Sequence, residues 1–460
     1  MVLVQELHER YLWVDRLCLI QDNLSKHDGI RNMGSIYSHA LLTIIALSGE
    51  DANHGLPGVF PGSRPPQMIQ RVKGVHLMPA LPDLQYALEA SLHTTRGWTF
   101  PEVLLSSRRL FVSDRQVYFN CQKGIVRGED SCQEHDPSFE AVYGLASQSG
   151  LYGGLVKSYT RRSLTYDTDI VDAFSGISSL LSREDQMNRR GELAAGLPLL
   201  NFLPHLLWVP ENSLVRRPPR TSDQLEDHFP SWSWIGWRGP VSYELLRLTS
   251  TIPRRPLKSF LAPCPMKYIQ PNGTQAIVYQ PDQGAERNRC SCTTWKRINH
   301  DPHAGMPTSL DELADPIVTH LRGRHILRFR TLTLPAASFS CMEEEDDGDG
   351  EDASDCPRLL YHGQVCGSII GQPSADVASN LPRYKWILLC YVQGLVFIIF
   401  DLMRMRGIDH DSENPESCRC VLFFLLVEPR EGLWERVALA IMNPGVFEGT
   451  NFQWEDIQLA

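Results

Sequence analysis

The hydrophobic positions near the N-terminus form two apolar runs with a helical stripe between them. The first run, residues 11–19, is interrupted at Asp15, and the second, residues 41–47, is short and rich in β-branched side chains. From Ile30 to Leu41, apolar residues recur at spacings of three and four, which predicts an amphipathic helix. The order strand, loop, helix, strand predicts two parallel strands buried on both faces and joined by a crossover helix.

The pattern further along divides the chain into three predicted regions. Residues 1–122 continue to combine strand-like apolar runs with helical stripes, which predicts an α/β unit with a partial parallel sheet. Residues 123–230 predict a mainly helical connecting region. Residues 231–460 consist of short alternating segments separated by turns, which predict a β-rich C-terminal region with an acidic disordered loop at residues 342–356.

Three segments carry more specific signals. Pro101 is well placed for the first turn of a helix that runs through Leu105. Residues 108–121 alternate on both sides of a polar turn and predict a hairpin. The apolar run at residues 386–400 is shorter than the ~20 residues of a membrane-spanning helix. Because Gln393 and a glycine lie at its middle, this run predicts a buried hairpin.

Charge excludes one class of partner. The formal net charge is −10, but eight acidic residues lie between Glu343 and Asp352. The rest of the chain has 44 basic and 46 acidic residues, so the folded body is almost neutral. The basic surface of a nucleic-acid-binding protein is therefore not expected.

Cysteine usage points to a reducing compartment. Twelve cysteines in 460 residues is too few for a disulfide scaffold, and residues 1–10 have no apolar core of a signal peptide. We therefore expect a cytoplasmic protein. The pairs Cys290 with Cys292 and Cys418 with Cys420 are closer in sequence than paired zinc ligands usually are, so no metal is expected.

Polar residues follow both predicted strands of the parallel pair. Since ligands bind beyond the carboxyl ends of parallel strands, these residues are the candidate site. Asp15 and Glu50 are the candidate catalytic carboxylates. The candidate ligand-positioning residues are Gln21, Asp22, Cys18 and Asp51, with Ser48 beside them.

Each candidate has a structural alternative. Asp15 could instead accept hydrogen bonds from backbone amides of the following loop, because an acid inside an apolar segment needs a partner. Cys18 could be an ordinary buried thiol, and Gln21 and Asp22 could cap the next helix. Glu50, with the acid that follows it, could lie in a solvated loop.

Aromatic residues mark packing positions. Arg96 and Glu102 could form an ion pair that holds Trp98 against the sheet. Trp232 and Trp234 alternate with small residues and predict a core or domain-junction strand. Phosphate-binding, metallohydrolase and serine-hydrolase motifs are not found, so the residues alone do not demonstrate an enzyme.

Several separated blocks resemble the fungal heterokaryon incompatibility (HET) domain. The blocks are YLWVDRLCLIQDN, MGSIYSHALLTIIAL, GLPG and TTRGWTFPEVLLSSRRLFV, followed by SYTRRSLTYDTDIVDAFSGI, FPSWSWIGWRG and ERVALAI. The signature residues that they contain are Trp13, Tyr37, Arg96, Trp98, Glu102, Trp232 and Trp234. The family usually begins with a further strand block and has Gln in place of Pro101. We therefore expect a HET unit that lacks its N-terminal block, from a gene model that starts too late or from a fragment.

The resemblance implies a role in fungal non-self recognition and programmed cell death. It also implies a fold distantly like the Toll/interleukin-receptor (TIR) domain, some members of which cleave NAD. NAD is then the expected substrate and no cofactor is expected. The expected partner is another protein or a second copy of the chain, not a nucleic acid or a membrane. The alternatives are a non-catalytic binding or scaffold protein and an inactive fragment.

Overall fold

The computed structural model divides into two compact units. Unit 1 comprises Met1–Ser147 and Gly154–Gly191, and unit 2 comprises Gln148–Gly153 and Glu192–Ala460. The residues that the structure describes are 1–19, 26–51, 53–121, 125–128, 132–134, 138–143, 145, 150–177, 181, 193–199, 202–222, 225–243, 245, 265–280, 323–342, 357–370, 377, 379–393, 420–447, 450 and 452–460.

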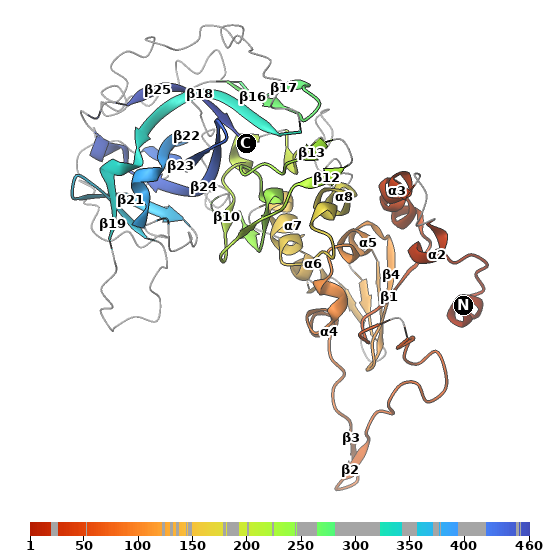
Figure 1. The fold of residues 1–460 in the computed structure, drawn as a ribbon. Helices are drawn as coiled ribbons and strands as arrows, with labels where there is room; N and C mark the ends of the chain where they lie inside the picture. Colours follow the sequence, from red (N-terminus) through yellow and green to blue (C-terminus); the bar gives the residue numbers. More distant parts are fainter. Residues whose placement is uncertain are drawn as a thin grey trace. The chain divides into compact units, whose positions relative to one another are not determined.

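Unit 1 is an α/β unit around a small mixed sheet (Figure 1). Its strands are β1 (Thr43–Ala46), β2 (Gln70–Val72), β3 (Val75–Leu77), β4 (Arg108–Val112), β5 (Val117–Cys121), β6 (Ile125–Arg127) and β7 (Cys132–Glu134). The sheet has the order β1-β4-β5-β6-β7, and β2 pairs only with β3 among the described strands. β1 and β4 are parallel, whereas β4 and β5 form an antiparallel hairpin.

Helices and aromatic side chains complete unit 1. Its helices are α1 (Val2–Glu6), α2 (Asp15–Cys18), α3 (Lys26–His39), α4 (Leu84–Glu89), η1 (Leu92–Thr95), α5 (Thr99–Leu105), α6 (Ser138–Tyr143), α7 (Gly150–Thr160, in this unit from Gly154), η2 (Asp167–Asp169) and α8 (Ile170–Ser175). α3 packs against α5 and α8, and α5 packs against β1. The Phe100 ring stacks on the Tyr143 ring, with the two centroids 5.7 Å apart, and its centroid lies 5.5 Å from that of the Tyr159 ring. These contacts hold α5 in the core.

The first predicted strand of the parallel pair is wrong. Residues 11–14 are extended and Asp15–Cys18 is a single turn of helix, α2. Two adjacent charges, Asp15 and Arg16, lie at the centre of the apolar run, and Leu17 is 82% exposed. A buried parallel strand requires burial on both faces, and this segment does not have it.

Four predicted elements of this unit are confirmed. The predicted helix is α3, the second strand is β1, the helix with Pro101 is α5, and the hairpin is β4–β5. A parallel pair exists, but the partner of β1 is β4, which follows 61 residues after the end of β1. The mixed α/β class with a partly parallel sheet is therefore confirmed, with a different pair of strands from the predicted one.

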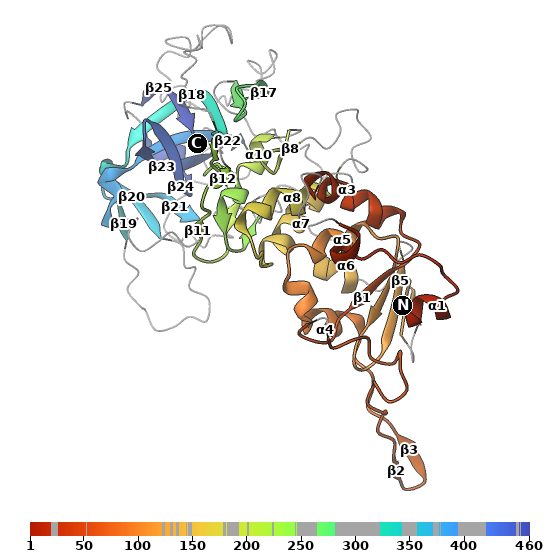
Figure 2. The same ribbon diagram turned by 45° about the vertical axis from the view of Figure 1, so that its right-hand side comes forward.

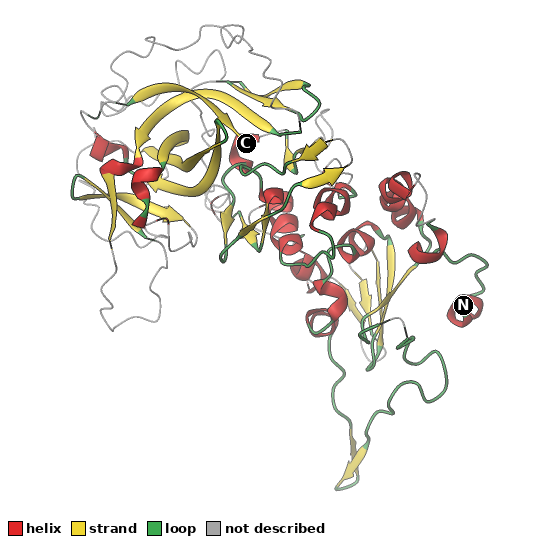
Figure 3. Ribbon diagram, in the orientation of Figure 1, coloured by secondary structure: helices red, strands yellow, loops and turns green. Residues whose placement is uncertain are grey.

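Unit 2 is built mainly of strands (Figure 3), which agrees with the predicted β-rich C-terminal part, whereas the short strands between Leu193 and Asp227 lie in the region predicted to be mainly helical. Its elements are β8 (Leu193–Ala194), β9 (Leu197–Pro198), α10 (Phe202–His205), β10 (Val209–Pro210), β11 (Val215–Arg216), β12 (Arg220–Ser222), β13 (Leu225–Asp227), η3 (Trp234–Gly236), β14 (Trp237–Arg238), β15 (Val241–Ser242), β16 (Met266–Ile269), β17 (Gln275–Tyr279), β18 (Ile326–Pro335), η7 (Ala336–Ser338), β19 (Phe339–Met342), β20 (Arg358–Tyr361), β21 (Gln364–Ile370), η8 (Leu381–Arg383), β22 (Lys385–Gln393), β23 (Cys420–Arg430), β24 (Leu433–Met442), η9 (Pro444–Phe447) and β25 (Gln453–Leu459).

Five of these strands form a closed circuit of pairings. β18 pairs with β22, β22 with β23, and β23 with β24, all antiparallel. β25 then pairs with β24 in parallel and with β18 in antiparallel orientation, which closes the ring. Since every strand in the ring has both edges engaged, closure protects these apolar strands from pairing with other chains. The predicted partner of β22 in the run at residues 386–400, and the acidic segment, lie outside the described residues.

The tryptophan cluster is buried but is not a strand. Trp232 and Trp234 are fully buried, which confirms the packing role, and Trp234 begins the 3₁₀ helix η3. Ser233 stabilises that turn because its Oγ accepts the backbone N–H of Ile235 at 3.4 Å. A side-chain cap of this kind competes with strand pairing, which explains the departure from the predicted strand.

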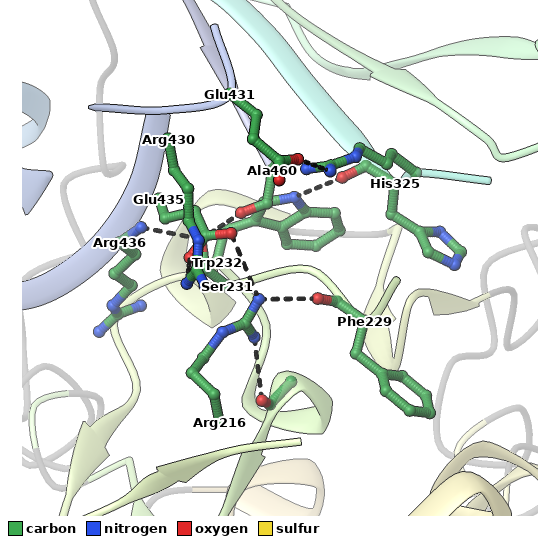
Figure 4. A network of polar contacts seen from close by, with 12 residues as sticks. Arg216, Phe229, Ser231, Trp232, His325, Arg430, Glu431, Glu435, Arg436 and Ala460 are labelled. Atoms are coloured by element: carbon green, nitrogen blue, oxygen red, sulfur yellow. Dashed lines mark hydrogen bonds and ion pairs between the residues drawn. The ribbon is translucent and has the colours of Figure 1, made fainter. Parts of the chain in front are cut away.

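Polar contacts tie these aromatic residues to the C-terminal strands (Figure 4). The Arg216 guanidinium donates to the carbonyl oxygens of Gly236 and Phe229 at 2.9 and 3.0 Å. Fully buried Arg436 donates to two carbonyl oxygens of the α10–β10 segment at 2.7 and 2.6 Å. Burial lowers the pKa of Arg436 to about 9. These two arginines bond main-chain oxygens and so serve the packing of unit 2.

Candidate functional site

Unit 1 contains a cleft of about 1250 Å³ that gathers charged side chains from distant parts of the sequence. It is lined by the α1–α2 segment, the end of α3, β1 and the loop after it, η1 and α5. The ionisable residues along it are Glu9, Tyr11, Asp15, Arg16, Tyr37, His39, Glu50, Asp51, His93, Arg96, Glu102 and Arg108. A cleft with convergent ionisable groups is the usual form of a small-molecule site.

Glu102 is the most strongly perturbed acid of this cleft. It lies in the first turn of α5, where every other residue of the helix is buried and apolar or a buried Thr. Burial, reinforced by the charge of Asp15, raises the pKa of Glu102 from 4.5 to about 7. The Tyr37 hydrogen bond and the charge of Arg96 oppose this rise. A carboxyl with this pKa can accept and release a proton near neutral pH.

Tyr37 positions Glu102 from the neighbouring helix. Its side chain is 7% exposed, and burial raises the pKa of its phenol, so the hydroxyl stays protonated and donates to Glu102. Trp13 packs edge-on against the Tyr37 ring, and the centroids of the two rings are 5.6 Å apart. Tyr37 therefore connects the segment before α2 with the acid on α5, although the two are almost ninety residues apart in sequence.

His93 adds a neutral imidazole to the same cleft. Burial, together with the charges of Arg162 and Arg96, lowers its pKa to about 3. Within the described part of the chain, its Nδ1 is buried without a hydrogen-bond partner. A neutral ring with an unsatisfied nitrogen can donate to or accept from a ligand.

The predicted catalytic residues Asp15 and Glu50 line this one cleft, although the first predicted strand does not exist. Asp15 is the first residue of α2, and its Oδ1 accepts the backbone N–H of Arg16 at 2.6 Å. Glu50 and Asp51 are exposed in the loop after β1. Asp51 Oδ1 accepts the backbone N–H of Asn53 at 2.8 Å, as in an Asx turn.

The remaining predicted site residues fall elsewhere. Ser48 lines the cleft and its Oγ accepts the backbone N–H of Asp114 at 2.6 Å. Cys18 is exposed in α2, so the buried-thiol alternative is wrong, and its Sγ accepts the backbone N–H of Val14 at 3.5 Å. Gln21 and Asp22 lie outside the described residues.

Glu102 has a larger role in the cleft than the sequence predicts. The pattern at residues 96–102 predicts packing for Arg96, Trp98 and Glu102. In the structure, Trp98 Nε1 donates to Asp169 Oδ2 at 3.1 Å, and Glu102 contacts Tyr37. The signal was available, because a single acid in an otherwise apolar helix needs a partner or a function.

Three surveys complete the description of the site. The family model described as heterokaryon incompatibility protein (HET) matches residues 1–102, which include Asp15, Tyr37 and Glu102. Residues 1–102 are thus similar to the HET domain, as the sequence blocks indicated. No curated protein and no solved structure matches the chain.

Two searches of the described residues found nothing. No group of three or more potential metal-ligating side chains occurs among them. Within the same parts of the chain, none of the helices has the length and hydrophobicity that crossing a membrane requires.

Proposed function

We propose that this chain acts in heterokaryon incompatibility, as a fungal protein of non-self recognition that signals or executes programmed cell death in the cytoplasm. Its HET domain has a TIR-like ancestry and acts after partner-driven or self-assembly. Its cleft cleaves NAD. The observation that carries the catalytic part is partly buried Glu102, whose pKa is raised to about 7 by desolvation and by the charge of Asp15, inside the segment that matches the HET family.

The cleft offers the groups that hydrolysis of an N-glycosidic bond requires. The bond between the ribose C1′ and the nicotinamide nitrogen breaks, and its electron pair leaves with nicotinamide. Ionised Glu102 accepts a proton from water as the water oxygen bonds to C1′. Asp15 stabilises the positive charge that develops on the ribose. Glu50, Asp51 and neutral His93 line the same cleft, and in this proposal they bind hydroxyl groups of the substrate.

Turnover by the purified full-length chain tests this function. Wild-type protein is expected to release nicotinamide and ADP-ribose from NAD. Glu102→Gln and Asp15→Asn are each expected to reduce kcat by about 100-fold or more. Glu140→Gln, an exposed acid on α6 outside the cleft lining, is the matched control and is expected to keep full turnover. Absence of turnover in the assembled wild-type protein, or full turnover in both cleft variants, would refute the catalytic part.

A second function has one observation in its favour. Asp15 Oδ1 already accepts the adjacent backbone N–H of Arg16, as a structural acid does. The HET unit would then be a non-catalytic binding or scaffold module in the same incompatibility process. NAD binding that persists without any turnover in the wild-type chain would favour this function.

A further inference from the structure

A small hairpin of unit 1 stands apart from the sheet of that unit in both views (Figures 1 and 2). It consists of β2 and β3, joined by Lys73 and Gly74. Both turn residues have positive φ, +48° and +85°, as in the two-residue turn that suits a twisted hairpin. All six strand residues are exposed. A two-stranded hairpin of this size is at best marginally stable in water without further contacts.

The hairpin exposes an unusual amount of apolar surface. Pairing of Val72 with Val75, and of Gln70 with Leu77, places three aliphatic side chains on one face. Apolar residues that flank the strands are exposed as well. The exposed apolar side chains are Met68, Ile69, Val72, Val75, Leu77 and Met78, with exposed fractions from 44% to 79%. Clusters of this kind on a protein surface mark interaction sites.

The same segment is basic in an acidic chain. Residues 52–82 contain Arg64, Arg71 and Lys73 and not one Asp or Glu, whereas the whole chain has a net charge of −10. Arg71 pairs with His76 on the face opposite the aliphatic side chains. The hairpin therefore has Arg71 on one face and Val72, Val75 and Leu77 on the other, with Lys73 in the turn.

We propose that the β2–β3 hairpin docks this chain onto an anionic lipid surface. Amphipathic segments with basic and aliphatic faces bind such surfaces by burying the aliphatic face while the cations meet acidic headgroups. The aliphatic side chains extend along both strands and their flanks, so a fluid interface covers them more completely than one rigid face does. A second copy fits less well, because it would bring Arg71 and Lys73 next to like charges. Surface contact of this kind departs from the sequence expectation of no membrane partner.

Vesicle co-sedimentation of the full-length chain tests this docking. Vesicles of phosphatidylcholine, with and without phosphatidylserine, are the probe. The chain is expected to sediment with the phosphatidylserine vesicles, and less so as salt is raised. Replacing both cations, Arg71→Gln with Lys73→Gln, is expected to lower the partition coefficient by about 30-fold. Removing aliphatic surface, Val75→Thr with Leu77→Thr, is expected to lower it by about tenfold.

Matched variants keep the test specific. Val215→Thr removes an aliphatic side chain that is 59% exposed in unit 2, close to the 60% of Val75, and Arg115→Gln removes an exposed cation of the β4–β5 turn. Both are expected to bind vesicles like the wild type. All variants alter exposed positions, so unchanged melting temperatures show that folding is intact. Three outcomes would overturn the proposal: no phosphatidylserine-dependent binding, equal losses in the control variants, or hairpin-dependent binding of soluble polyglutamate or of a second copy in place of vesicles.

Discussion

Replacing Glu102 by Gln is expected to stabilise the protein at alkaline pH. The folded state raises the pKa of Glu102 from 4.5 to about 7, so the folded state binds this proton more tightly than the unfolded state. Stability is therefore lost as pH rises from about 4.5 through 7, and the ionised carboxylate costs about 3 kcal/mol at pH 8. At pH 5 the cost is less than about 1 kcal/mol. Gln has a similar shape and carries no charge, so it removes this cost.

Calorimetric unfolding of the full-length chain at pH 5 and pH 8 measures the effect. The free energy of unfolding of Glu102→Gln, relative to that of the wild type, is expected to be about 2.5 kcal/mol higher at pH 8 than at pH 5. Asp15→Asn is expected to give part of that gain, because the charge of Asp15 contributes to the raised pKa of Glu102. Glu140→Gln, at an exposed position, is the control and should give none. If Glu102→Gln and wild type differ by the same amount at both pH values, Glu102 does not have the environment described here.

Two further predictions concern unit 2. Arg436→Met leaves two buried carbonyl oxygens without their donor and is expected to lower the free energy of unfolding by about 2–4 kcal/mol, measured by thermal unfolding. Gly367→Ala places a Cβ 2.1 Å from the backbone oxygen of Ile441 on the paired strand, so it should cost about 1–3 kcal/mol in the same assay. The control Gly445→Ala, whose nearest neighbour is a side-chain atom of Asn443 at 3.3 Å, should cost less, and equal losses would contradict the strand packing.

Local sequence patterns predicted individual helices and strands better than they predicted which strands pair with each other. The periodicity that leads to Tyr37 predicted α3, and the β-branched run predicted β1, because both signals are local. The apolar run around Trp13 and Asp15 predicts a strand, but the structure leaves most of that segment exposed. Exposure of this kind depends on tertiary packing, which the local pattern does not report. Pairing of β1 with β4 could not be read from sequence, since a connection of this length leaves no local signal.

The candidate site stays a prediction, and the structure changes the geometric reason for it. Asp15 and Glu50 line one cleft, but the expected rim of two adjacent parallel strands does not exist. Glu102 and His93 acquire their shifted pKa values from burial and from neighbouring charges. Burial of an ionisable group depends on how helices pack, and sequence spacing does not report it.

Release of ADP-ribose from NAD by the purified full-length chain, compared between wild type and Glu102→Gln, tests the central claim most directly. Wild-type turnover is expected to rise as pH passes about 7, where Glu102 ionises, and the variant is expected to be about 100-fold or more slower above that pH. Wild-type turnover that Glu102→Gln leaves unchanged, or no turnover in the assembled wild-type protein, would contradict it.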